Sequence, residues 1–300
     1  MRELLRISGK PVLSLHDTFE TMKRIAALTM VRSDNDFLRK WVEYYSAAFG
    51  PDNLYVWFDG LDQTVPDFCS DVHTARIEHV SADVHVGDRR RAAFLSERAS
   101  ELFSDGYELV VGTDVDEFLV VDPSLGLSLA EFLSSVRTSL PSISGLGVDV
   151  GQRLPQEGRI DWSSPFLTQR SYAKLSTRYS KATVLCRPVA WGSGFHRTRR
   201  GNFHIVKDLF LFHFGCVDID RIKSKMSDSD LTQEGWSRHL AKRAGTIRLV
   251  SGHRAHGWER SVSMARRVQN MVRPPYAWNK PAMFELRLVV KIPSRFCSVV

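Results

Sequence analysis

The sequence predicts an α/β fold in which a mixed, mainly parallel sheet is flanked by helices. Short apolar runs rich in β-branched residues, typical of buried strands, occur at 25–31, 54–58 and 109–111. Stretches with apolar residues at helical spacing separate these runs, from 37 to 45 and from 89 to 103. Strands that alternate with helices in this order are typical of a nucleotide-binding α/β half.

The first helix has clear boundaries in the sequence. Ser33 or Asp34 can cap its N-terminus, and Gly50-Pro51-Asp52 ends it. The strand that follows ends at Asp59-Gly60, so we expect the first two strands and this helix to form a parallel βαβ unit. A weaker third strand is predicted at 77–80.

The second half of the chain has one strong strand signal, at 209–214. Helical spacing predicts two helices, at 230–243 and 264–271, and prolines interrupt the pattern after 273. We therefore expect a main domain at 20–220 and a basic C-terminal extension at 221–300, helical or irregular, that packs on the same domain.

Charge is unevenly distributed along the chain. Residues 1–150 hold 14 Lys and Arg against 24 Asp and Glu, a net charge of −10, whereas residues 151–300 hold 27 against 10, a net charge of +17. The basic half is expected to attract phosphates, an acidic glycan or, in peripheral contact, an anionic membrane surface, unless it is simply a solvated face. Aromatic and basic residues alternate after 190, but no recognised nucleic-acid motif accompanies them, so nucleic acid is not expected as a partner. The basic side chains are Arg197, Arg199, Arg200, Lys207, Lys223, Lys225, Arg238, Lys242, Arg243, Arg248, Arg254, Arg266 and Arg267.

Several classes of protein are not supported by the sequence. It has no apolar run of about 18 residues and no hydrophobic signal region near Met1, so a cytoplasmic protein is expected, with peripheral membrane contact as the alternative. The widely spaced Cys69, Cys186, Cys216 and Cys297 predict reduced thiols rather than disulfides or a zinc site. P-loop, dinucleotide-binding and serine-hydrolase motifs are absent from the sequence.

Three acids follow the buried strand at 109–111, namely Asp114, Asp116 and Glu117. In an open α/β sheet the carboxyl end of a strand opens into the ligand crevice, and acids so close together repel one another unless cations or donors neutralise them. Hard oxygen ligands suit Mg²⁺ or Mn²⁺, so a divalent metal at Asp114 and Asp116 is expected. The alternative is that these acids cap a helix or line a solvated turn.

Several blocks of the chain resemble family 2 glycosyltransferases with the GT-A fold, and most closely their family 92-like branch. Asp-Val-Asp-Glu-Phe-Leu at 114–119 looks like the metal-binding Asp-x-Asp-Glu-Phe segment of that family. Residues 28–45 are similar to its opening strand and helix, and 54–62 to its second strand with a nucleotide-facing acid. Residues 181–188 and the later Gly194-Phe195-His196 resemble its Lys-x-x-x-x-x-Arg-Pro strand and following His. The resemblance covers roughly 26–218.

The resemblance implies a metal-dependent transferase that moves a sugar from a nucleotide-diphosphate donor to a glycan or glycolipid acceptor with inversion, in polysaccharide or glycoconjugate assembly. Asp59 and Asp62 would accept hydrogen bonds from the donor's base and ribose. His213, or alternatively His196, would complete the metal shell of Asp114 and Asp116. Cations would help neutralise the leaving diphosphate, and the candidates for this role are Arg32, Arg90 and Lys181.

The catalytic base is poorly marked. Asp149 is our first candidate, and Asp161 and His196 compete with it. Asp149 lies in a glycine-rich stretch, 145–151, that could simply form a loop, and this stretch departs from the Trp-x-x-Phe-Gly pattern of the resembled family. Two other functions stay open: a metal-dependent nucleotidyltransferase, and a non-catalytic protein that binds glycans or polyanions.

Overall fold

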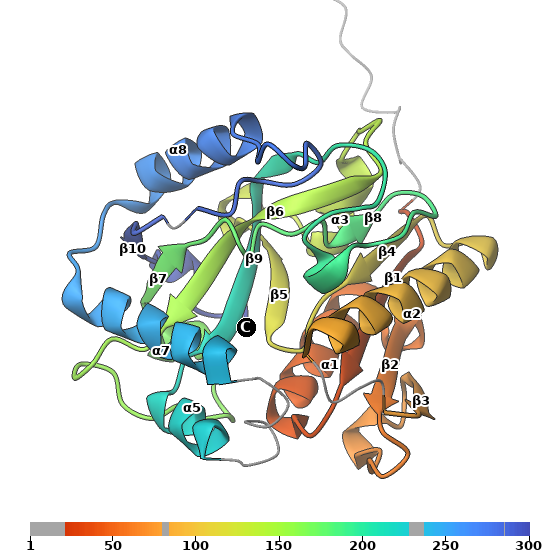
Figure 1. Cartoon of the computed structure of the whole chain (residues 1–300), viewed down its shortest axis with the longest axis horizontal. Helices are drawn as coiled ribbons and strands as arrows, with labels where there is room; N and C mark the ends of the chain where they lie inside the picture. Colours follow the sequence, from red (N-terminus) through yellow and green to blue (C-terminus); the bar gives the residue numbers. More distant parts are fainter. Residues whose placement is uncertain (1–21, 80–83, 228–236, 285) are drawn as a thin grey trace, which may run out of the picture.

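The structure is a computed structural model that describes residues 22–79, 84–227, 237–284 and 286–300 (Figure 1). The described strands form one 10-stranded sheet in the order β10-β7-β6-β8-β4-β1-β2-β3, to which β9 is joined through β6, and β5 through β9. The strands are β1 (Ile25–Val31), β2 (Leu54–Asp59), β3 (His73–Ile77), β4 (Leu109–Gly112), β5 (Glu117–Val121), β6 (Ser142–Gly151), β7 (Tyr172–Leu175), β8 (Val184–Leu185), β9 (Ile205–Cys216) and β10 (Val289–Lys291). The predicted mixed α/β sheet is confirmed.

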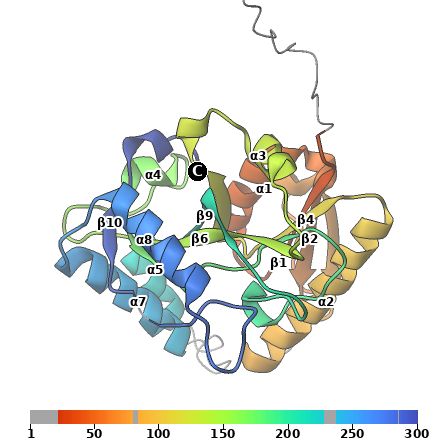
Figure 2. The ribbon, with the colours of Figure 1, turned by 90° about the horizontal axis from the view of Figure 1, so that it is seen from above.

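Helices lie on both sides of this sheet (Figure 2). They are α1 (Asn35–Phe49), α2 (Val84–Ser104), α3 (Leu129–Ser135), α4 (Phe166–Gln169), α5 (Ile219–Met226), α7 (Ser237–Gly252) and α8 (Trp258–Met271). Single 3₁₀ turns add η1 (Pro51–Asn53), η2 (Asp67–Cys69), η3 (Pro123–Leu125), η4 (Ser193–Phe195) and η5 (Ser294–Phe296). In the described part of the chain, no helix combines the length and the apolar character needed to cross a membrane.

Strands β3, β2, β1 and β4 are all parallel to one another, as the βαβ pattern predicts. Because side chains alternate along a strand, β1 contributes side chains to two separate hydrophobic cores, one on each face of the sheet. Ile25 and Ala27 pack with the apolar face of α1, whereas Ala26 and Leu28 pack with α2 on the other face. The carboxyl ends of these strands therefore lie at one edge between two layers of helix, which is where an α/β sheet binds its ligands.

The other half of the sheet is mostly antiparallel, apart from the long parallel pair β6 and β9. Gly147 of β6 is needed for close packing: a Cβ there would lie 2.4 Å from the carbonyl oxygen of Ser176. The glycine-rich stretch 145–151 is thus part of a buried strand and not a loop. This strand carries Asp149 into the interior.

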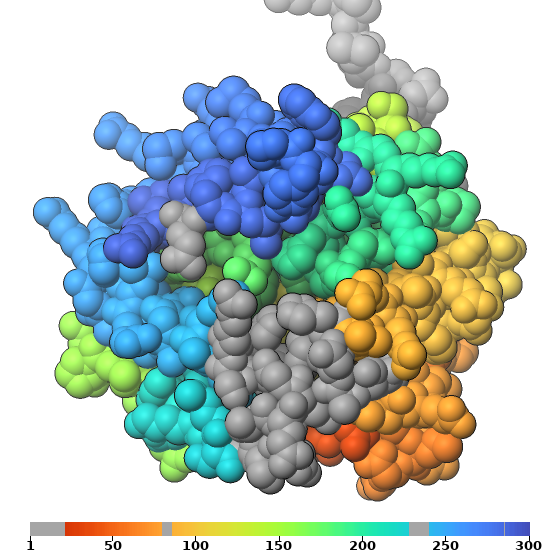
Figure 3. Space-filling view, viewed as in Figure 1, coloured from red at the N-terminus to blue at the C-terminus, as the bar shows by residue number. Residues whose placement is uncertain are grey.

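The C-terminal residues pack on the same sheet. Strand β10 pairs with β7, and Trp258 of α8 packs against Phe210 and Phe212 of β9. On the face seen in Figure 3, the segment after α8 (dark blue) lies beside residues near 200 (blue-green), where Asn279 donates a hydrogen bond to the carbonyl of Thr198.

The boundaries of three elements differ from the sequence predictions. The third strand is centred earlier, at His73–Ile77, and Val80 lies outside the described residues. The helix predicted at 230–243 overlaps α7, which continues to Gly252, while 230–236 lie outside the described part. The helix predicted at 264–271 begins earlier, at Trp258, because Trp258 is part of its buried face.

Candidate active site

Asp114, Asp116 and Glu117 lie together in the turn that joins β4 to β5. A ligand oxygen from each of the three carboxylates lies within 4.8 Å of the other two. The turn is held by Thr113, whose hydroxyl accepts a hydrogen bond from Trp41 Nε1 (2.8 Å) and whose carbonyl accepts one from a buried Thr29 hydroxyl (2.8 Å). The acids are therefore fixed by α1 and β1 at the carboxyl end of the parallel strands.

Lys181 neutralises one side of this acidic cluster. Its Nζ donates to Oδ2 of Asp114 (2.9 Å) and lies 2.5 Å from Oε1 of Glu117. Burial alone would lower the pKa of Lys181, but the two carboxylates outweigh it and raise that pKa. Burial opposes the charge of Asp114 in the same way, and Lys181 and Arg91, the latter 3.9 Å away, nevertheless lower its pKa.

Arg243 of α7 neutralises the other side. Its Nη2 donates to Oδ2 of Asp116 (2.9 Å), and Nε2 of His213 lies 3.4 Å from the same oxygen. Although Asp116 is buried, which opposes its charge, these two cations lower its pKa. Asp116 is therefore ionised at neutral pH and paired on two sides.

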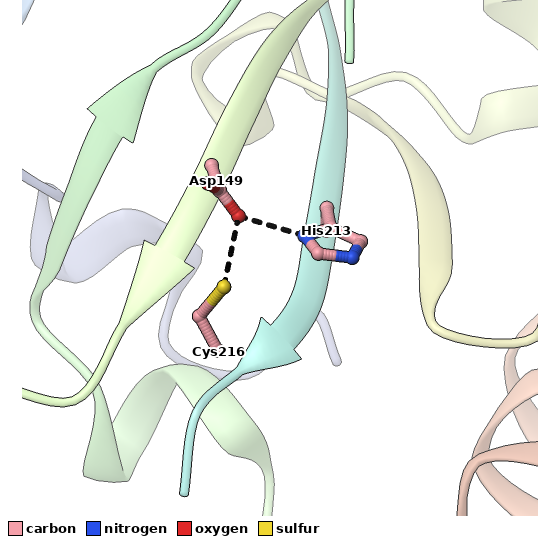
Figure 4. Close-up of side chains that lie close together, drawn as sticks. All are labelled: Asp149, His213 and Cys216. Atoms are coloured by element: carbon pink, nitrogen blue, oxygen red, sulfur yellow. Dashed lines mark hydrogen bonds and ion pairs between the residues drawn. The ribbon is translucent and has the colours of Figure 1, made fainter. Parts of the chain in front are cut away.

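His213 links Asp116 to Asp149, and Figure 4 shows its contact with Asp149. The register of β6 and β9 places Asp149 directly opposite His213, and Nδ1 of the imidazole donates to Oδ1 of Asp149 (2.7 Å). The ring also stacks on Tyr179, with 3.8 Å between ring centroids. Burial would lower the pKa of His213, but Asp116 and Asp149 raise it well above its usual value, so the imidazole is protonated at neutral pH.

Asp149 is buried and fully engaged. Besides the imidazole, Oδ1 accepts from the Cys216 thiol (3.5 Å), and Oδ2 accepts from the Thr246 hydroxyl (2.9 Å). Burial raises the pKa of the Cys216 thiol to about 11, so this group is a neutral donor. Asp149, His213 and Cys216 also offer ligand atoms within 4.8 Å of one another, and Figure 4 shows the three side chains converging from β6 and the end of β9.

Glu117 differs from its two neighbours. It is fully buried, and neither of its carboxylate oxygens has a hydrogen-bond partner of good geometry among the described residues. Burial raises its pKa to about 7, because the nearby Lys181 offsets the loss of water only in part. An additional cation beside Glu117 would stabilise its ionised form.

The acidic cluster fits a hard divalent cation by its donor set. It offers carboxylate oxygens from three residues, and among the described residues the two oxygens of Glu117 accept no hydrogen bond. The Asp114 side chain is 32% exposed, so an ion could reach it. A third ligand from His213 requires the ring to lose its proton, because a protonated imidazole has no free lone pair. His196 is half-buried, and its burial beside Lys181 lowers its pKa to about 3, so it is neutral.

The other predicted donor-binding residues form a separate group at the ends of β1 and β2. Arg32 donates to the carbonyl of Asp59 (2.7 Å) and makes two hydrogen bonds to the carboxylate of Asp62 (3.0 and 3.1 Å). His79 Nδ1 lies 3.1 Å from Oδ1 of the buried Asp59. They lie at the same edge of the sheet as Asp114, because β1, β2 and β4 are parallel.

Two predicted residues lie apart from the acidic cluster. Arg90 is exposed on α2, and its neighbour Arg91 is the residue that approaches Asp114. Asp161 is an exposed acid that accepts hydrogen bonds from Ser163 and Ser164, which makes it a local turn residue.

Sequence reasoning missed the role of several residues that the structure places at the site. Arg243, Thr246, Cys216, Tyr179 and Arg91 all contact one of the predicted acids or His213. Arg243 and Thr246 are three residues apart on one face of α7, a spacing that is visible in the sequence but gives no clue to which acids they meet.

Comparisons with known proteins give little beyond this geometry. No protein-family model and no curated protein matches the sequence. Among solved structures, the chain is similar to a mannose-1-phosphate geranyltransferase from Thermus thermophilus, with 12% identity, a TM-score of 0.28, and 90% of this chain and 74% of that chain covered. It is also similar to a mannosyltransferase from Pyrobaculum calidifontis in complex with GDP-Man and Mn²⁺, with 9% identity, a TM-score of 0.35, and 82% and 79% covered. TM-scores this low support no conclusion about what the protein does.

Proposed function

We propose that this protein is a metal-dependent glycosyltransferase of the GT-A type. It moves a sugar from a nucleotide-diphosphate donor to a glycan or glycoconjugate acceptor, with inversion. The observation that carries the proposal is the cluster of Asp114, Asp116 and Glu117 at the carboxyl end of β4, fixed between Lys181 and Arg243. Nucleotides bind α/β sheets at this edge, and carboxylates there suit a metal that accompanies a diphosphate.

The charges in the cluster support joint binding of the donor and the metal. Asp114, Asp116 and Asp149 are balanced by Lys181, Arg243 and protonated His213, and Glu117 is held near its titration point. Binding of Mn²⁺ or Mg²⁺ alone would therefore add positive charge to a group of side chains that is already nearly neutral. A diphosphate would offset that added charge, so we expect the metal to bind much more tightly with the donor than without it.

Each group then has a role. Asp114 and Asp116 would hold the metal, which supplies charge stabilisation for the leaving diphosphate, and Lys181 would add a fixed positive charge beside it. Arg32, Asp59 and Asp62 would bind the nucleoside part of the donor. Asp149 is the proposed base, because it is the acid that lines the cavity next to the cluster.

The direct test is release of nucleoside diphosphate from a panel of nucleotide sugars with Mn²⁺. Asp114→Asn and Asp116→Asn should each lower the rate on the order of 100-fold or more, because a metal ligand is lost. Asp71→Asn, at an exposed acid outside the cluster, is the control and should leave the rate unchanged. Absence of Mn²⁺-dependent release across the panel, or normal turnover by Asp114→Asn, would refute the proposal.

The same carboxylates would serve a nucleotidyltransferase, which is the second candidate. That enzyme joins a nucleotide to a sugar phosphate and releases pyrophosphate instead of nucleoside diphosphate, so the product separates the two reactions. A non-catalytic glycan or polyanion binder would keep its ligand affinity in Asp114→Asn and Asp116→Asn.

A further inference from the structure

The cavity that Asp149 lines adjoins the acidic cluster and has a strongly basic lining. Its volume is about 490 Å³, and it lies between α7, the end of β7 and the residues that follow β7. Arg243 and Asp149 line it, and both also connect to Asp116, one directly and the other through His213. The cavity is thus continuous with the proposed catalytic groups without being the metal site.

Six cationic side chains line this cavity, and among the described residues Asp149 is its one acid. Asp149 is already engaged by His213, Thr246 and Cys216. The cationic residues are Lys174, Arg178, Lys242, Arg243, Arg248 and Arg287.

Three of these arginines have no carboxylate partner in the part of the chain that the structure describes. Within those residues, neither Arg178, Arg248 nor Arg287 makes an ion pair, while Arg243 is held by Asp116. Guanidinium groups gathered without counter-charge repel one another, so an anion in the cavity would be bound favourably. Such an arrangement is what recognition of a multiply charged group requires.

Phosphate matches this lining better than a single carboxylate. A phosphate monoester carries between one and two negative charges and three acceptor oxygens, enough for several guanidinium donors at once. The volume is within the range of small-molecule sites, roughly 300 to 1,000 Å³, so it has room for a sugar together with its phosphate. Ser176 and Thr246 add hydroxyl groups to the lining.

We propose that this cavity binds the acceptor. The acceptor carries a phosphate group, which Arg178, Arg248 and Arg287 bind. This inference rests on the proposed glycosyltransferase function, since it names the acceptor class of that same site. The phosphate places the acceptor's hydroxyl near Asp149. A phosphorylated sugar and a lipid that ends in a phosphate monoester, such as phosphatidic acid, share this chemistry.

The first test measures binding without donor or metal. Glucose 6-phosphate, glucose and inorganic phosphate are titrated into the protein by calorimetry, and vesicles that contain phosphatidic acid are compared with phosphatidylcholine vesicles by co-sedimentation. We expect glucose 6-phosphate to bind and glucose not to bind. Selective binding to vesicles with phosphatidic acid, lost in the double variant Arg248→Gln/Arg287→Gln, would identify the lipid as the source of the phosphate.

The variant Arg248→Gln/Arg287→Gln should weaken phosphate binding about tenfold or more. Arg260→Gln/Arg267→Gln is the matched control, since it removes the same charge from exposed positions of α8, away from the cavity. Arg178→Gln is a third variant, which tests the half-buried arginine by itself. Equal affinity in the cavity variants and the control, or equal binding of glucose and glucose 6-phosphate, would overturn the inference.

The outcome is distinguishable from failure of the proposed function. If the wild-type protein releases nucleoside diphosphate with Mn²⁺ but phosphate binding does not depend on the cavity arginines, the acceptor inference is wrong and the function stands. If phosphate binding depends on those arginines but no nucleotide sugar is turned over, the glycosyltransferase proposal fails and, with it, the acceptor assignment.

Discussion

Replacing Glu117 by glutamine tests the electrostatics of the acidic cluster through protein stability. Burial raises the pKa of Glu117 from 4.5 to about 7 in the folded protein. Between these two pH values the folded state keeps a proton that the unfolded chain has released. The free energy of unfolding therefore falls as the pH rises from 4.5 to 7, and this one group contributes about 3 kcal/mol to the fall.

Glutamine has a similar shape and does not titrate, so Glu117→Gln should lack this contribution. At pH 4.5 the variant and the wild type should have similar free energies of unfolding, and at pH 8 the variant should be about 3 kcal/mol more stable relative to the wild type. Urea denaturation at several pH values, with a chelator present, measures both curves. Glu43→Gln, at an exposed acid of α1, is the control and should follow the wild type. Parallel curves for Glu117→Gln and wild type between pH 4.5 and 8 would show that Glu117 ionises normally.

Three further changes follow from the packing and the hydrogen bonds. Arg170 is 1% exposed and donates hydrogen bonds to the carbonyls of Val217, Gly158 and Gln169. Arg170→Met should therefore lower the free energy of unfolding, measured by urea denaturation, by about 3 kcal/mol or more. A decrease below about 1 kcal/mol would contradict this expectation. Gly147→Ala should either lower the free energy of unfolding by about 2 kcal/mol or more, or prevent folding, because a Cβ would clash with the backbone of Ser176 and Ser180. Gly158→Ala is the control and should fold normally, because the space around Gly158 is open. Asp116→Asn should lower the pKa of His213, because it removes a carboxylate that raises this pKa. NMR titration of the imidazole measures the change. An unchanged pKa would mean that Asp149 alone keeps the imidazole protonated.

Local sequence patterns were enough to predict the parallel half of the fold. The apolar runs of β1, β2 and β4 and the helical spacing of α1 and α2 depend on neighbours within a few residues of one another. Asp114 and Asp116 could be singled out for the same reason, because they directly follow a buried strand. The outcome for these elements agrees with the prediction of a mixed α/β sheet.

The partners of these acids could not be predicted, because they depend on long-range pairing. Asp149 contacts His213 because of the register between β6 and β9. The glycines of β6 look like a loop in the sequence, although they let this strand pack closely against neighbouring backbone. Arg243 is one of many basic residues in the second half of the chain, and nothing local separates it from Lys242 or Arg248. The role of His213 as a protonated link between two carboxylates likewise needs both carboxylates in place.

The distance in sequence between Asp116 and Arg243 has a consequence for biosynthesis. These two residues are 127 positions apart, and Lys181 comes from a third segment, 67 positions beyond Asp114. While the ribosome has made only the first half of the chain, the three neighbouring carboxylates lack both Lys181 and Arg243, and Arg91, 3.9 Å from Asp114, offsets their mutual repulsion only in part. Thr29 and Trp41 already hold the turn between β4 and β5, but Asp116 gains Arg243 only when α7 has been made. We therefore expect the charges of the acidic cluster to be balanced only after the last third of the chain has emerged from the ribosome.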